Sequence, residues 1–568
     1  MADGINRYNG FLNIYKEAGW TSMDVCAKLR GILGMRKIGH AGTLDPMAEG
    51  VLPVALGRAT RDVDRIGDGT KTYEAGLLLG KTTDTQDITG RVLTENGGPL
   101  PEAETVREAI LSFQGSYEQL TPMYSARKVD GKKLYEYARA GKEVARKTKR
   151  VEILSIEILS MDLPHVRFRV TCTKGTYVRT LCHDIGEKLH CGGCMESLLR
   201  TQVGDFGLDT ALRLSEVEAL RDQGGLDAAL VIKAPTAVAL GKFDGTHIGH
   251  QQLFRTLRRV AGEQKLKTCV LILDFSAKSL EDRSDRKREL YAFGIDYVIE
   301  LTLNEKLMRM SAEEFLQRIL LEQLNMHAIV AGKDVSFGYQ KAGNAAFLEA
   351  HAAKAGYTVE LIDKVELKLT EALPEPVEEE TEAGVADAGE SEADEGKQGA
   401  PDCSVVVSSS RVREELQAGR MENVAVLMGK AYSLSGTVVH GRHLGQTVLG
   451  FPTMNIDVPA DLLLPPCGVY AVRLRFEGSD AIYDGIANLG SKPTVEQPGE
   501  AAPVNLETYV FDYSGDAYGQ KISVELLKFI RPERKFQNLE ALKEQLLGRD
   551  VEIARRFLQT HGRRAAKG

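Results

Sequence analysis

The sequence predicts a globular chain of several domains that ends in a small antiparallel β-barrel. Its 568 residues exceed one ordinary domain and are typical of three or four. Residues Val231–Gly241 read as a link into a buried strand, which is followed by a glycine-containing loop and a helix expected from Gln251, the local order of an α/β fold. Beyond residue 421, short alternating segments separated by Gly and Pro indicate the barrel.

Composition restricts the class of protein. Hydrophobic residues make up 43% of the chain and charged residues 27%, as in soluble globular proteins. No run reaches the ~18 apolar residues that a membrane span requires, and Met1–Arg7 lacks the apolar core of a signal peptide. Eight cysteines in a chain of this length do not indicate a disulfide framework. We therefore expect a cytoplasmic protein.

The net charge of −8 has its origin in one stretch. Residues 371–396 hold eleven Asp and Glu and no Lys or Arg, so the remainder of the chain carries +3 and is able to meet polyanions. Residues 370–402 contain few large apolar side chains and cannot bury enough surface to offset the entropy of ordering. We predict a disordered insertion in a loop, which chain entropy tolerates at this length.

The first 200 residues alternate strands with helices. We expect strands at Phe11–Lys16, Lys71–Gly80 and Val166–Cys172. A helix is predicted over Ser22–Leu33, with Thr21 or Ser22 as its N-cap and an acidic residue in its first turn.

The stretch Gly39–Leu52 presents one carboxylate, Asp45, in a loop rich in glycine. Glycine lets the backbone take unusual dihedral angles and approach a ligand closely, and Pro46 stiffens the chain after the carboxylate. The apolar run Val51–Leu56 anchors this loop. Such a carboxylate is a candidate nucleophile, although Asp-Pro in a glycine-rich loop is also a common turn.

Over many consecutive positions, Gly39–Leu52 resembles the signature of the TruB-type tRNA pseudouridine synthases, which isomerise uridine 55 in the T loop of tRNA. The resemblance implies an α+β pseudouridine-synthase fold, tRNA as substrate, no cofactor, and Asp45 as the catalytic residue. Lys174–Arg179 is similar to the family block whose arginine pairs with the catalytic Asp, which keeps that carboxylate ionised and oriented. The implied uridine and tRNA contacts are His40, Tyr73, Tyr177, Arg179 and Leu198.

A basic stretch supports contact with RNA. Arg127–Arg150 holds ten Lys and Arg against three Asp and Glu, and Tyr124, Tyr135 and Tyr137 lie in or beside it. A basic face with aromatic residues suits an RNA backbone and unstacked bases. A charge run is also the usual surface of a solvated helix, so this signal is supporting only.

After the buried strand that ends at Gly241, Lys242–His250 contains two histidines spaced as His-x-Gly-His. Strand, glycine loop and helix N-terminus form a phosphate-binding layout, in which both imidazoles can stabilise charge as pyrophosphate leaves ATP. With its flanks, this stretch resembles the N-terminal nucleotidyltransferase domain of bacterial FAD synthetase, which implies a Rossmann-like α/β domain with His247 and His250 as catalytic residues. The implied nucleotide contacts are Gly241, Phe243, Asp244, Gly245, Gly249, Asp334, Ser409, Ser410, Arg411 and Arg413.

This middle domain also departs from its family. Ser408–Arg413 is similar to the family's phosphate-gripping loop, but Asp274–Leu280 replaces a Phe-Asp/Glu-Pro-His-Pro segment that lies near the flavin. Adenylylation of FMN is therefore the activity that the sequence supports least.

The C-terminal part resembles riboflavin kinase in Leu449–Asn455 and Asn505–Phe511. The resemblance implies that Thr453 and Asn455 hold Mg²⁺ with the ATP phosphates, since Mg²⁺ prefers such hard oxygen ligands. It also implies that Glu507 is the general base for the ribityl 5′-hydroxyl, because phosphoryl transfer needs mainly positioning and charge neutralisation. Glu525 lacks the flanking match, and Gln446 stands where the family has arginine.

Cys191 and Cys194 have the spacing of metal ligands. A zinc site would need two more ligands, and although Cys182 and His183 are available, no second Cys or His pair follows. We interpret these cysteines as structural or incidental.

The sequence is interpreted as a fusion with domains at 1–232, 233–420 and 421–568. We expect it to convert uridine 55 of tRNA to pseudouridine, and riboflavin to FMN and then FAD, with ATP and Mg²⁺ in the flavin half. Neither a membrane nor an obligate protein partner is expected. One alternative keeps the synthase and kinase beside an inactive middle domain; another is a tRNA-binding or folding factor.

Overall fold

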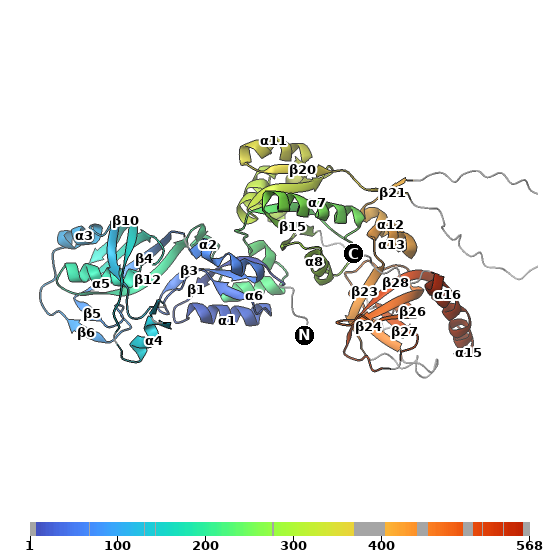
Figure 1. Cartoon of the computed structure of the whole chain (residues 1–568), viewed down its shortest axis with the longest axis horizontal. Helices are drawn as coiled ribbons and strands as arrows, with labels where there is room; N and C mark the ends of the chain where they lie inside the picture. The colour runs from blue at the N-terminus through green and yellow to red at the C-terminus, as the bar shows by residue number, and fades with distance from the viewer. Residues whose placement is uncertain are drawn as a thin grey trace, which may run out of the picture.

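The computed structural model places the described chain in three bodies along its long axis (Figure 1). The described residues are 7–67, 69–125, 127–129, 131–142, 144–274, 278–368, 404–439, 453–491, 504–513, 515–534, 536, 537 and 539–560. The predicted insertion 370–402 lies outside these residues, as do Gln446 and three residues of the altered segment, 275–277.

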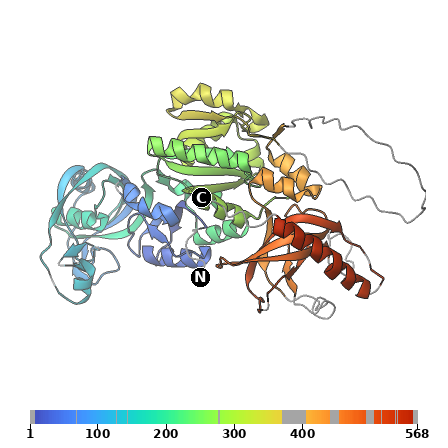
Figure 2. The same cartoon turned by 45° about the vertical axis from the view of Figure 1, so that its right-hand side comes forward.

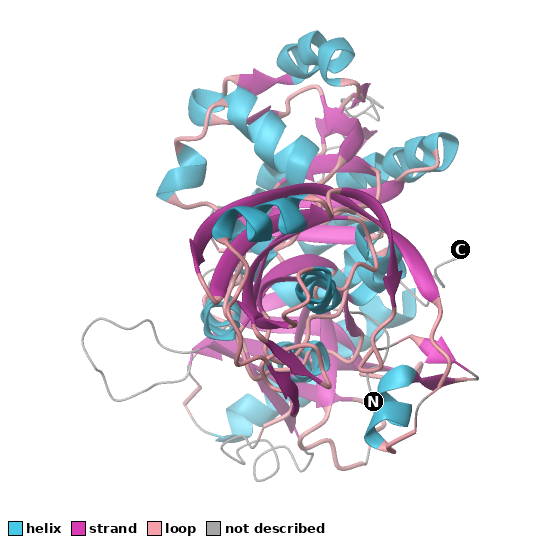
Figure 3. Cartoon of the chain, turned by 90° about the vertical axis from the view of Figure 1, so that its left-hand side faces the viewer, coloured by secondary structure: helices cyan, strands magenta, loops and turns pink. Residues whose placement is uncertain are grey.

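A nine-stranded sheet forms the N-terminal domain, in the order β1-β3-β12-β4-β11-β10-β7, with β2 beside β3 and β13 beside β12. Neighbouring strands are antiparallel, except that β3 and β12 run parallel. Figure 3 views the chain from this end and shows how strongly the sheet curves. The strands are β1 (Gly10–Lys16), β2 (Ile38–His40), β3 (Glu49–Leu56), β4 (Lys71–Leu79), β7 (Gly115–Leu120), β10 (Thr148–Asp162), β11 (His165–Cys172), β12 (Gly193–Val203) and β13 (Phe206–Gly207).

The helices of this domain are α1 (Ser22–Leu33), α2 (Val63–Gly67), α3 (Ala103–Leu111), α4 (Leu134–Arg139), α5 (Val178–Lys188) and α6 (Leu214–Asp222). Two small antiparallel strand pairs are also present: β5 (Lys81–Thr83) with β6 (Val92–Glu95), and β8 (Lys128–Val129) with β9 (Lys132–Lys133). The bounds predicted for α1 are confirmed. The Thr21 side chain accepts from the Asp24 N–H while the Asp24 carboxylate accepts from the Thr21 N–H, which is a capping box. Gly34 ends the helix in the left-handed conformation.

The middle domain is a five-stranded parallel sheet in the order β16-β15-β14-β17-β20, which confirms the Rossmann-like prediction. Its strands are β14 (Thr236–Gly241), β15 (Lys267–Asp274), β16 (Tyr297–Thr302), β17 (Met326–Gly332) and β20 (Thr358–Ile362), and its helices include α7 (Ile248–Gln264), α8 (Arg283–Ala292), α9 (Glu305–Met308), α10 (Ala312–Glu314) and α11 (Ala345–Ala355). Because the chain leaves central β14 and returns on both sides, the loops after β14 and β17 open at one edge of the sheet.

Two short strands and two helices lead onward: β21 (Glu366–Lys368) pairs with β22 (Ser404–Val406), and α12 (Ser409–Gln417) is followed by α13 (Met421–Met428). The two helices lie where the middle domain meets the C-terminal body (Figures 1 and 2).

The C-terminal domain is a six-stranded antiparallel sheet, ordered β23-β28-β25-β26-β27-β24. The sheet curls into a half-barrel, and its edges meet where the Val439 N–H donates to the Asn455 carbonyl at 2.8 Å. A helix over Val551–Thr560 packs on β25, β26 and β28. The elements are β23 (Tyr432–Thr437), β24 (Thr453–Asp457), β25 (Gly468–Phe476), β26 (Ile482–Ser491), β27 (Val504–Val510), β28 (Lys521–Pro532), α15 (Leu539–Lys543), a π-helical stretch Glu544–Asp550 and α16 (Val551–Thr560).

The N-terminal and middle domains share one buried core. A continuous apolar cluster extends from β1 and β3 through Leu230 and Ile232 to β14 and β16. Polar contacts reinforce it, since Arg58 pairs with Asp296 at 2.7 Å. In the part of the chain that the structure describes, no helix has the length and apolar character to cross a membrane.

Candidate functional site

Asp45 lies in the loop between β2 and β3, and the N-terminus of α1 holds this loop in place. The Leu44 N–H donates to Ser22 Oγ at 2.9 Å, and the Ser22 hydroxyl donates back to the Leu44 carbonyl at 3.2 Å. Gly42 has φ +95°, a conformation that side chains other than glycine rarely take. The glycine-rich sequence therefore folds into a turn that presents the carboxylate.

Arg200, on β12, holds the same loop from the sheet. Its side chain is fully buried. Nε donates to the Val51 carbonyl at 2.7 Å, and the terminal nitrogens donate to the carbonyls of Gly42 at 3.2 Å and Thr43 at 3.4 Å. A buried guanidinium is stable only when it is paired in this way, so Arg200 and the loop depend on each other.

Lys16, the last residue of β1, holds the loop beyond Asp45. Its ammonium donates to the carbonyls of Trp20 at 2.7 Å and Pro46 at 3.1 Å. Burial lowers the pKa of Lys16 to about 8, although the carboxylates of Glu49 and Asp45 oppose that effect.

Arg179 faces the Asp45 carboxylate. Its Nη2 lies 3.5 Å from Asp45 Oδ1 and its Nη1 lies 3.8 Å from Asp87 Oδ2, so two carboxylates share one guanidinium. Nη2 also donates to the Tyr124 carbonyl, whereas the buried Nε has no hydrogen-bond partner among the described residues. The predicted Asp–Arg pair is thus present, with a second acid beside it.

Burial raises the pKa of Asp45, with 31% of its side chain still exposed. Arg179 is the largest opposing influence, and Asp87 adds to the increase. The effect expected of Arg179, which favours the ionised carboxylate, therefore acts against desolvation. A raised pKa makes the ionised carboxylate a better nucleophile and base.

The other residues predicted for the uridine pocket lie on neighbouring elements. Tyr73 on β4 is buried and stands opposite Arg200 of β12, and Leu198 is two residues earlier on β12. Tyr177 is the residue before α5, where Gln119 bonds both its N–H and its carbonyl. His40 ends β2, and its buried Nδ1 has no partner within the described structure. Burial, and secondarily Arg200, lowers the pKa of His40.

The His-x-Gly-His motif of the middle domain forms the start of α7, which begins at Ile248 and not at Gln251 as predicted. The two imidazoles are stacked, with ring centroids 3.6 Å apart. Gly249 leaves room for this arrangement, since a Cβ there would lie 3.2 Å from His247 Nδ1. Burial lowers the pKa of His247 to about 4 and lowers that of His250 well below its usual value, so both rings are neutral at pH 7 in the free protein.

Asp244 connects this motif with the Ser408–Arg413 block. Its carboxylate accepts from the Leu280 N–H at 2.7 Å and from Arg413 Nη2 at 2.5 Å, and its carbonyl accepts from Ser409 Oγ at 2.9 Å. The resemblance implied that this block is a loop, and that prediction is wrong. The block forms the first turn of α12, because Ser408 caps the helix by accepting from the Arg411 N–H.

The remaining predicted nucleotide contacts are spread around this edge. Gly241 ends β14, and Gly245 takes φ +79°. Asp334 follows β17, is exposed, and pairs with Lys364 at 3.1 Å. Ser410 is exposed, whereas Arg411 bonds Glu414 and Glu415 of its own helix. Phe243 is buried against His250, with ring centroids 5.2 Å apart.

The C-terminal candidates lie together on one face of the half-barrel. The Thr453 hydroxyl donates to Glu507 Oε1 at 2.8 Å, and Asn455 is directly opposite Glu507 in the β24–β27 register. Asn455 Oδ1 accepts from Asn505 at 3.3 Å. Paired positions of antiparallel strands project to the same side, so hydroxyl, amide and carboxylate oxygens converge there. Glu525 is on β28 and pairs with Arg475 at 3.6 Å, apart from this group.

Sequence reasoning missed three residues of the first site: Lys16, Asp87 and Arg200. One signal was available for Lys16, which continues the core face of a strand after two buried apolar residues at alternate positions. Arg200 likewise follows Leu198 on the buried face of β12. A charged residue that continues the buried face of a strand is itself expected to be buried and paired with a fixed partner.

Cys191 and Cys194 are both buried free thiols. Among the residues the structure describes, no group of three or more His, Cys, Asp or Glu side chains is arranged to hold a metal ion.

Four family models match the chain. TruB family pseudouridylate synthase (N terminal domain) matches residues 30–178, and tRNA pseudouridylate synthase B C-terminal domain matches 179–231. FAD synthetase matches 231–372, and riboflavin kinase matches 428–558.

Similar curated proteins include two named tRNA pseudouridine synthase B. The one from Alkaliphilus oremlandii is 51% identical over 38% of this chain and 71% of its own length. The one from Lachnoclostridium phytofermentans is 55% identical over 37% of this chain and 71% of its own length. Both matches fall within the N-terminal part.

Proposed function

Because the chain belongs to the TruB family of pseudouridylate synthases and also carries FAD synthetase and riboflavin kinase domains, we propose that it performs three reactions with separate sites. The first converts uridine 55 of tRNA to pseudouridine, the second phosphorylates riboflavin to FMN, and the third adenylylates FMN to FAD. The domains that we assign to them are 1–232, 421–568 and 233–420, respectively.

Asp45 acts at the ribose–uracil bond. The C1′–N1 bond breaks, the uracil turns, and C5 bonds to C1′. C5 then loses its proton and N1 gains one, so the reaction needs no oxidant or second substrate. The nucleotide must first leave its stack, at a cost of a few kcal/mol that stacking in the pocket offsets. The observation that carries this assignment is Asp45 facing Arg179 on a loop fixed by buried Arg200 and Lys16.

In the kinase domain, Glu507 removes the proton of the ribityl 5′-hydroxyl while ATP is held beside it. The hydroxyl of Thr453, the amide of Asn455 and the carboxylate of Glu507 supply hard oxygen atoms on one face, a donor set that fits Mg²⁺. Thr453 and Asn455 would hold the ion, which would neutralise charge on the ATP phosphates.

In the middle domain, His247 and His250 bind the ATP phosphates at the N-terminus of α7. Their low pKa values mean that they meet the nucleotide as neutral donors, and the triphosphate itself would favour their protonation. Asp244 fixes the loop before them through Leu280 and Arg413.

One preparation tests all three assignments, because each activity serves as the folding control for the others. The wild-type chain should form pseudouridine at position 55 of tRNA, and FMN followed by FAD from riboflavin, ATP and Mg²⁺. Asp45→Asn should lose only the first activity, Glu507→Gln only FMN formation, and His247→Asn only FAD formation from supplied FMN. A loss of at least about 10³-fold is expected where a nucleophile or base is removed.

Several results would contradict the proposal. Pseudouridine formation by Asp45→Asn would mean that the carboxylate is not catalytic. If the wild-type chain bound tRNA but did not isomerise it, the result would favour a tRNA-binding factor. FMN without FAD, even with supplied FMN, would leave the middle domain without its activity.

A further inference from the structure

The loop that precedes His247 has an unusual backbone. Phe243 has φ +48° and Thr246 has φ +26°, values that residues with a Cβ rarely take, least of all β-branched threonine. Such conformations persist only where surrounding groups hold them, and they gather at functional sites. The groups that hold Thr246 therefore set the position of the histidine that follows it.

A pair of carboxylates holds the Thr246 side chain, which is fully buried. The Thr246 hydroxyl donates to Glu289 Oε2 at 2.6 Å, with Glu281 Oε1 as a second acceptor at 3.2 Å. Glu281 comes from the stretch before α8 and Glu289 from α8 itself. Their side chains are only 11% and 22% exposed, so their two negative charges repel each other in a poorly solvated place.

Lys430 supplies the positive charge that this pair requires. Its ammonium lies 2.5 Å from Glu289 Oε2 and also contacts Glu281 Oε1. Lys430 lies between α13 and β23, where the chain enters the kinase domain, 141 residues from Glu289 in sequence. One cation from a distant segment thus keeps two carboxylates together under Thr246.

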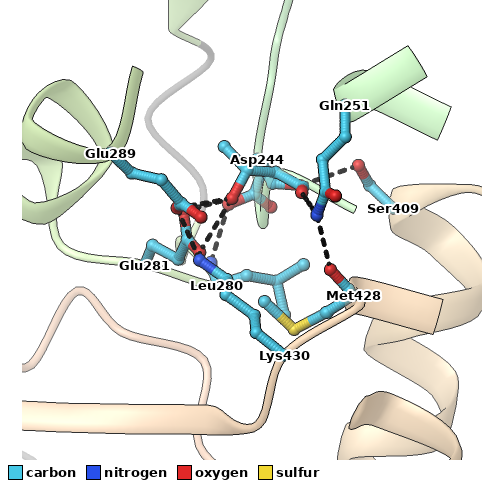
Figure 4. Close-up of polar contacts among 9 residues, drawn as sticks. Asp244, Gln251, Leu280, Glu281, Glu289, Ser409, Met428 and Lys430 are labelled. Carbon is cyan, nitrogen blue, oxygen red and sulfur yellow. Dashed lines mark hydrogen bonds and ion pairs between the residues drawn. The ribbon is translucent and has the colours of Figure 1, made fainter. Parts of the chain in front are cut away.

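A second contact joins the same two segments. The Gln251 side-chain amide donates to the Thr246 carbonyl at 3.1 Å and to the Met428 carbonyl at 2.8 Å, so it connects the loop with the end of α13. Gly429 lets the chain pass close to α7, since a Cβ there would lie 2.9 Å from Ile248 Cγ2. The turn at residues 428–430 therefore packs against the start of the helix that carries both histidines (Figure 4).

We propose that Lys430 is a positioning residue for FMN adenylylation: through Glu281, Glu289 and Thr246 it holds the loop that places His247, so the adenylyltransferase site is completed by the segment that leads into the kinase domain. This inference rests on the function proposed for the middle domain. Lys430 touches no reacting atom, and it acts only through the carboxylates and Thr246.

Lys430→Met tests the inference in the full-length protein. It leaves Glu281 and Glu289 without their cation, so the Thr246 loop loses its support and His247 is misplaced. Misplacement of this kind costs on the order of 10- to 100-fold in rate. We expect kcat for FAD formation from supplied FMN to fall by that amount, with KM for FMN and for ATP changing less than about threefold. Lys430→Arg, which keeps a cation with hydrogen-bond donors, should recover most of kcat.

Two further variants sharpen the result. Lys528→Met is the matched control, because Lys528 also pairs with a glutamate, Glu422, at 3.0 Å and has a similar exposure of 28% against 34% for Lys430. It should leave FAD formation unchanged. Thr246→Val keeps the side-chain shape but removes the hydroxyl, and it should reproduce the kcat loss without involving Lys430, whereas Thr246→Ser should not.

FMN formation and tRNA isomerisation are measured in every variant. Normal values of both beside a reduced kcat for FAD, with recovery by Lys430→Arg, support the inference. Unchanged FAD formation in Lys430→Met would overturn it, and so would loss of all three activities together, which would assign Lys430 a general role in folding. Absence of FAD formation in the wild type would instead refute the proposed function of the domain.

Discussion

Single residues set the chemistry of the N-terminal site through their burial and their partners. Asp45 is desolvated, shares Arg179 with Asp87, and consequently has a raised pKa. The Arg179 guanidinium lowers the pKa of Asp45, but by less than desolvation raises it. The balance between these two effects decides at which pH the carboxylate ionises.

Arg179→Gln should move the acid limb of the pH–rate profile of tRNA isomerisation to higher pH. Arg179 is the largest influence that lowers the pKa of Asp45, so its removal raises that pKa further and leaves less of the carboxylate ionised at any given acidic pH. We also expect a fall in kcat/KM on the order of 10²-fold at neutral pH. The measurement is kcat/KM between pH 5 and pH 8.

The control for this variant is Arg169→Gln. Arg169 also pairs with carboxylates, those of Glu74 and Glu157, but its side chain is 42% exposed on β11. The acid limb of the pH–rate profile of Arg169→Gln should match that of the wild type. If Arg179→Gln left the limb in place, the ionisation that limits the rate would belong to another group.

At the scale of elements, the parallel junction of β3 and β12 determines where the Asp45 loop ends. Gly50 pairs with Arg200 in this junction and has φ +103°. A Cβ at this position would lie 2.2 Å from the Arg200 carbonyl oxygen. The strands approach so closely only because position 50 has no side chain, and the same approach brings the Arg200 guanidinium under the loop.

Gly50→Ala should therefore separate the two strands and release the loop. Backbone strain and overpacking together predict a loss of at least about 2 kcal/mol in the free energy of unfolding. Pseudouridine formation should fall sharply while FMN formation is retained. Thermal unfolding and the two assays measure these effects.

Gly39→Ala is the matched variant within the same motif. No atom lies within 4 Å of a Cβ placed there, and its φ is outside the left-handed region. It should change stability by less than about 0.5 kcal/mol. Equal effects of the two substitutions would mean that the close approach at Gly50 does not govern the loop.

For the whole molecule, the shared core indicates that the N-terminal and middle domains are one folding unit. Asp227, which is 4% exposed, accepts from the Glu300 N–H at 3.2 Å and pairs with Lys287 of α8. Phe11 and Val231 exchange backbone hydrogen bonds of 2.8 and 2.9 Å beside these contacts. A flexible linker between two independent enzymes would show neither feature.

Asp227→Ala should lower the stability of both domains together. It leaves the Lys287 ammonium in a largely buried place with a weaker partner, Glu300 at 3.8 Å, at a cost on the order of 3 kcal/mol. In urea, tRNA isomerisation and FAD formation should disappear in a single transition, at a lower concentration than in the wild type. Residual activity after incubation at each concentration is the measurement.

The exposed pair of Glu305 with Arg309 supplies the comparison, since both side chains are more than 70% accessible. Glu305→Gln should change stability by less than about 0.5 kcal/mol. Separate transitions for the two activities in the wild type would show that the domains fold independently.

Local sequence predicted much of this fold, and it singled out residues that the structure brings together. The bounds of α1 followed from its capping residues, and the parallel sheet of the middle domain followed from one strand, loop and helix. Contiguous motifs singled out Asp45 and the two histidines, whereas Thr453 and Glu507, which are 54 residues apart, came from two separate motifs that the sheet brings together. Helix starts were less certain: α7 and α12 extend into motifs that were read as loops.

By itself the sequence determined the family resemblances, which the matching models confirm, and it singled out the side chains that we propose carry the chemistry. Only the tertiary structure decided what holds those side chains in place. Arg200 reaches a carbonyl 149 residues away, and Lys430 reaches a glutamate at the same separation. The physical reason is that a lysine or arginine looks the same in sequence whether it is solvated or buried, and its role follows from the distant partners that burial forces upon it.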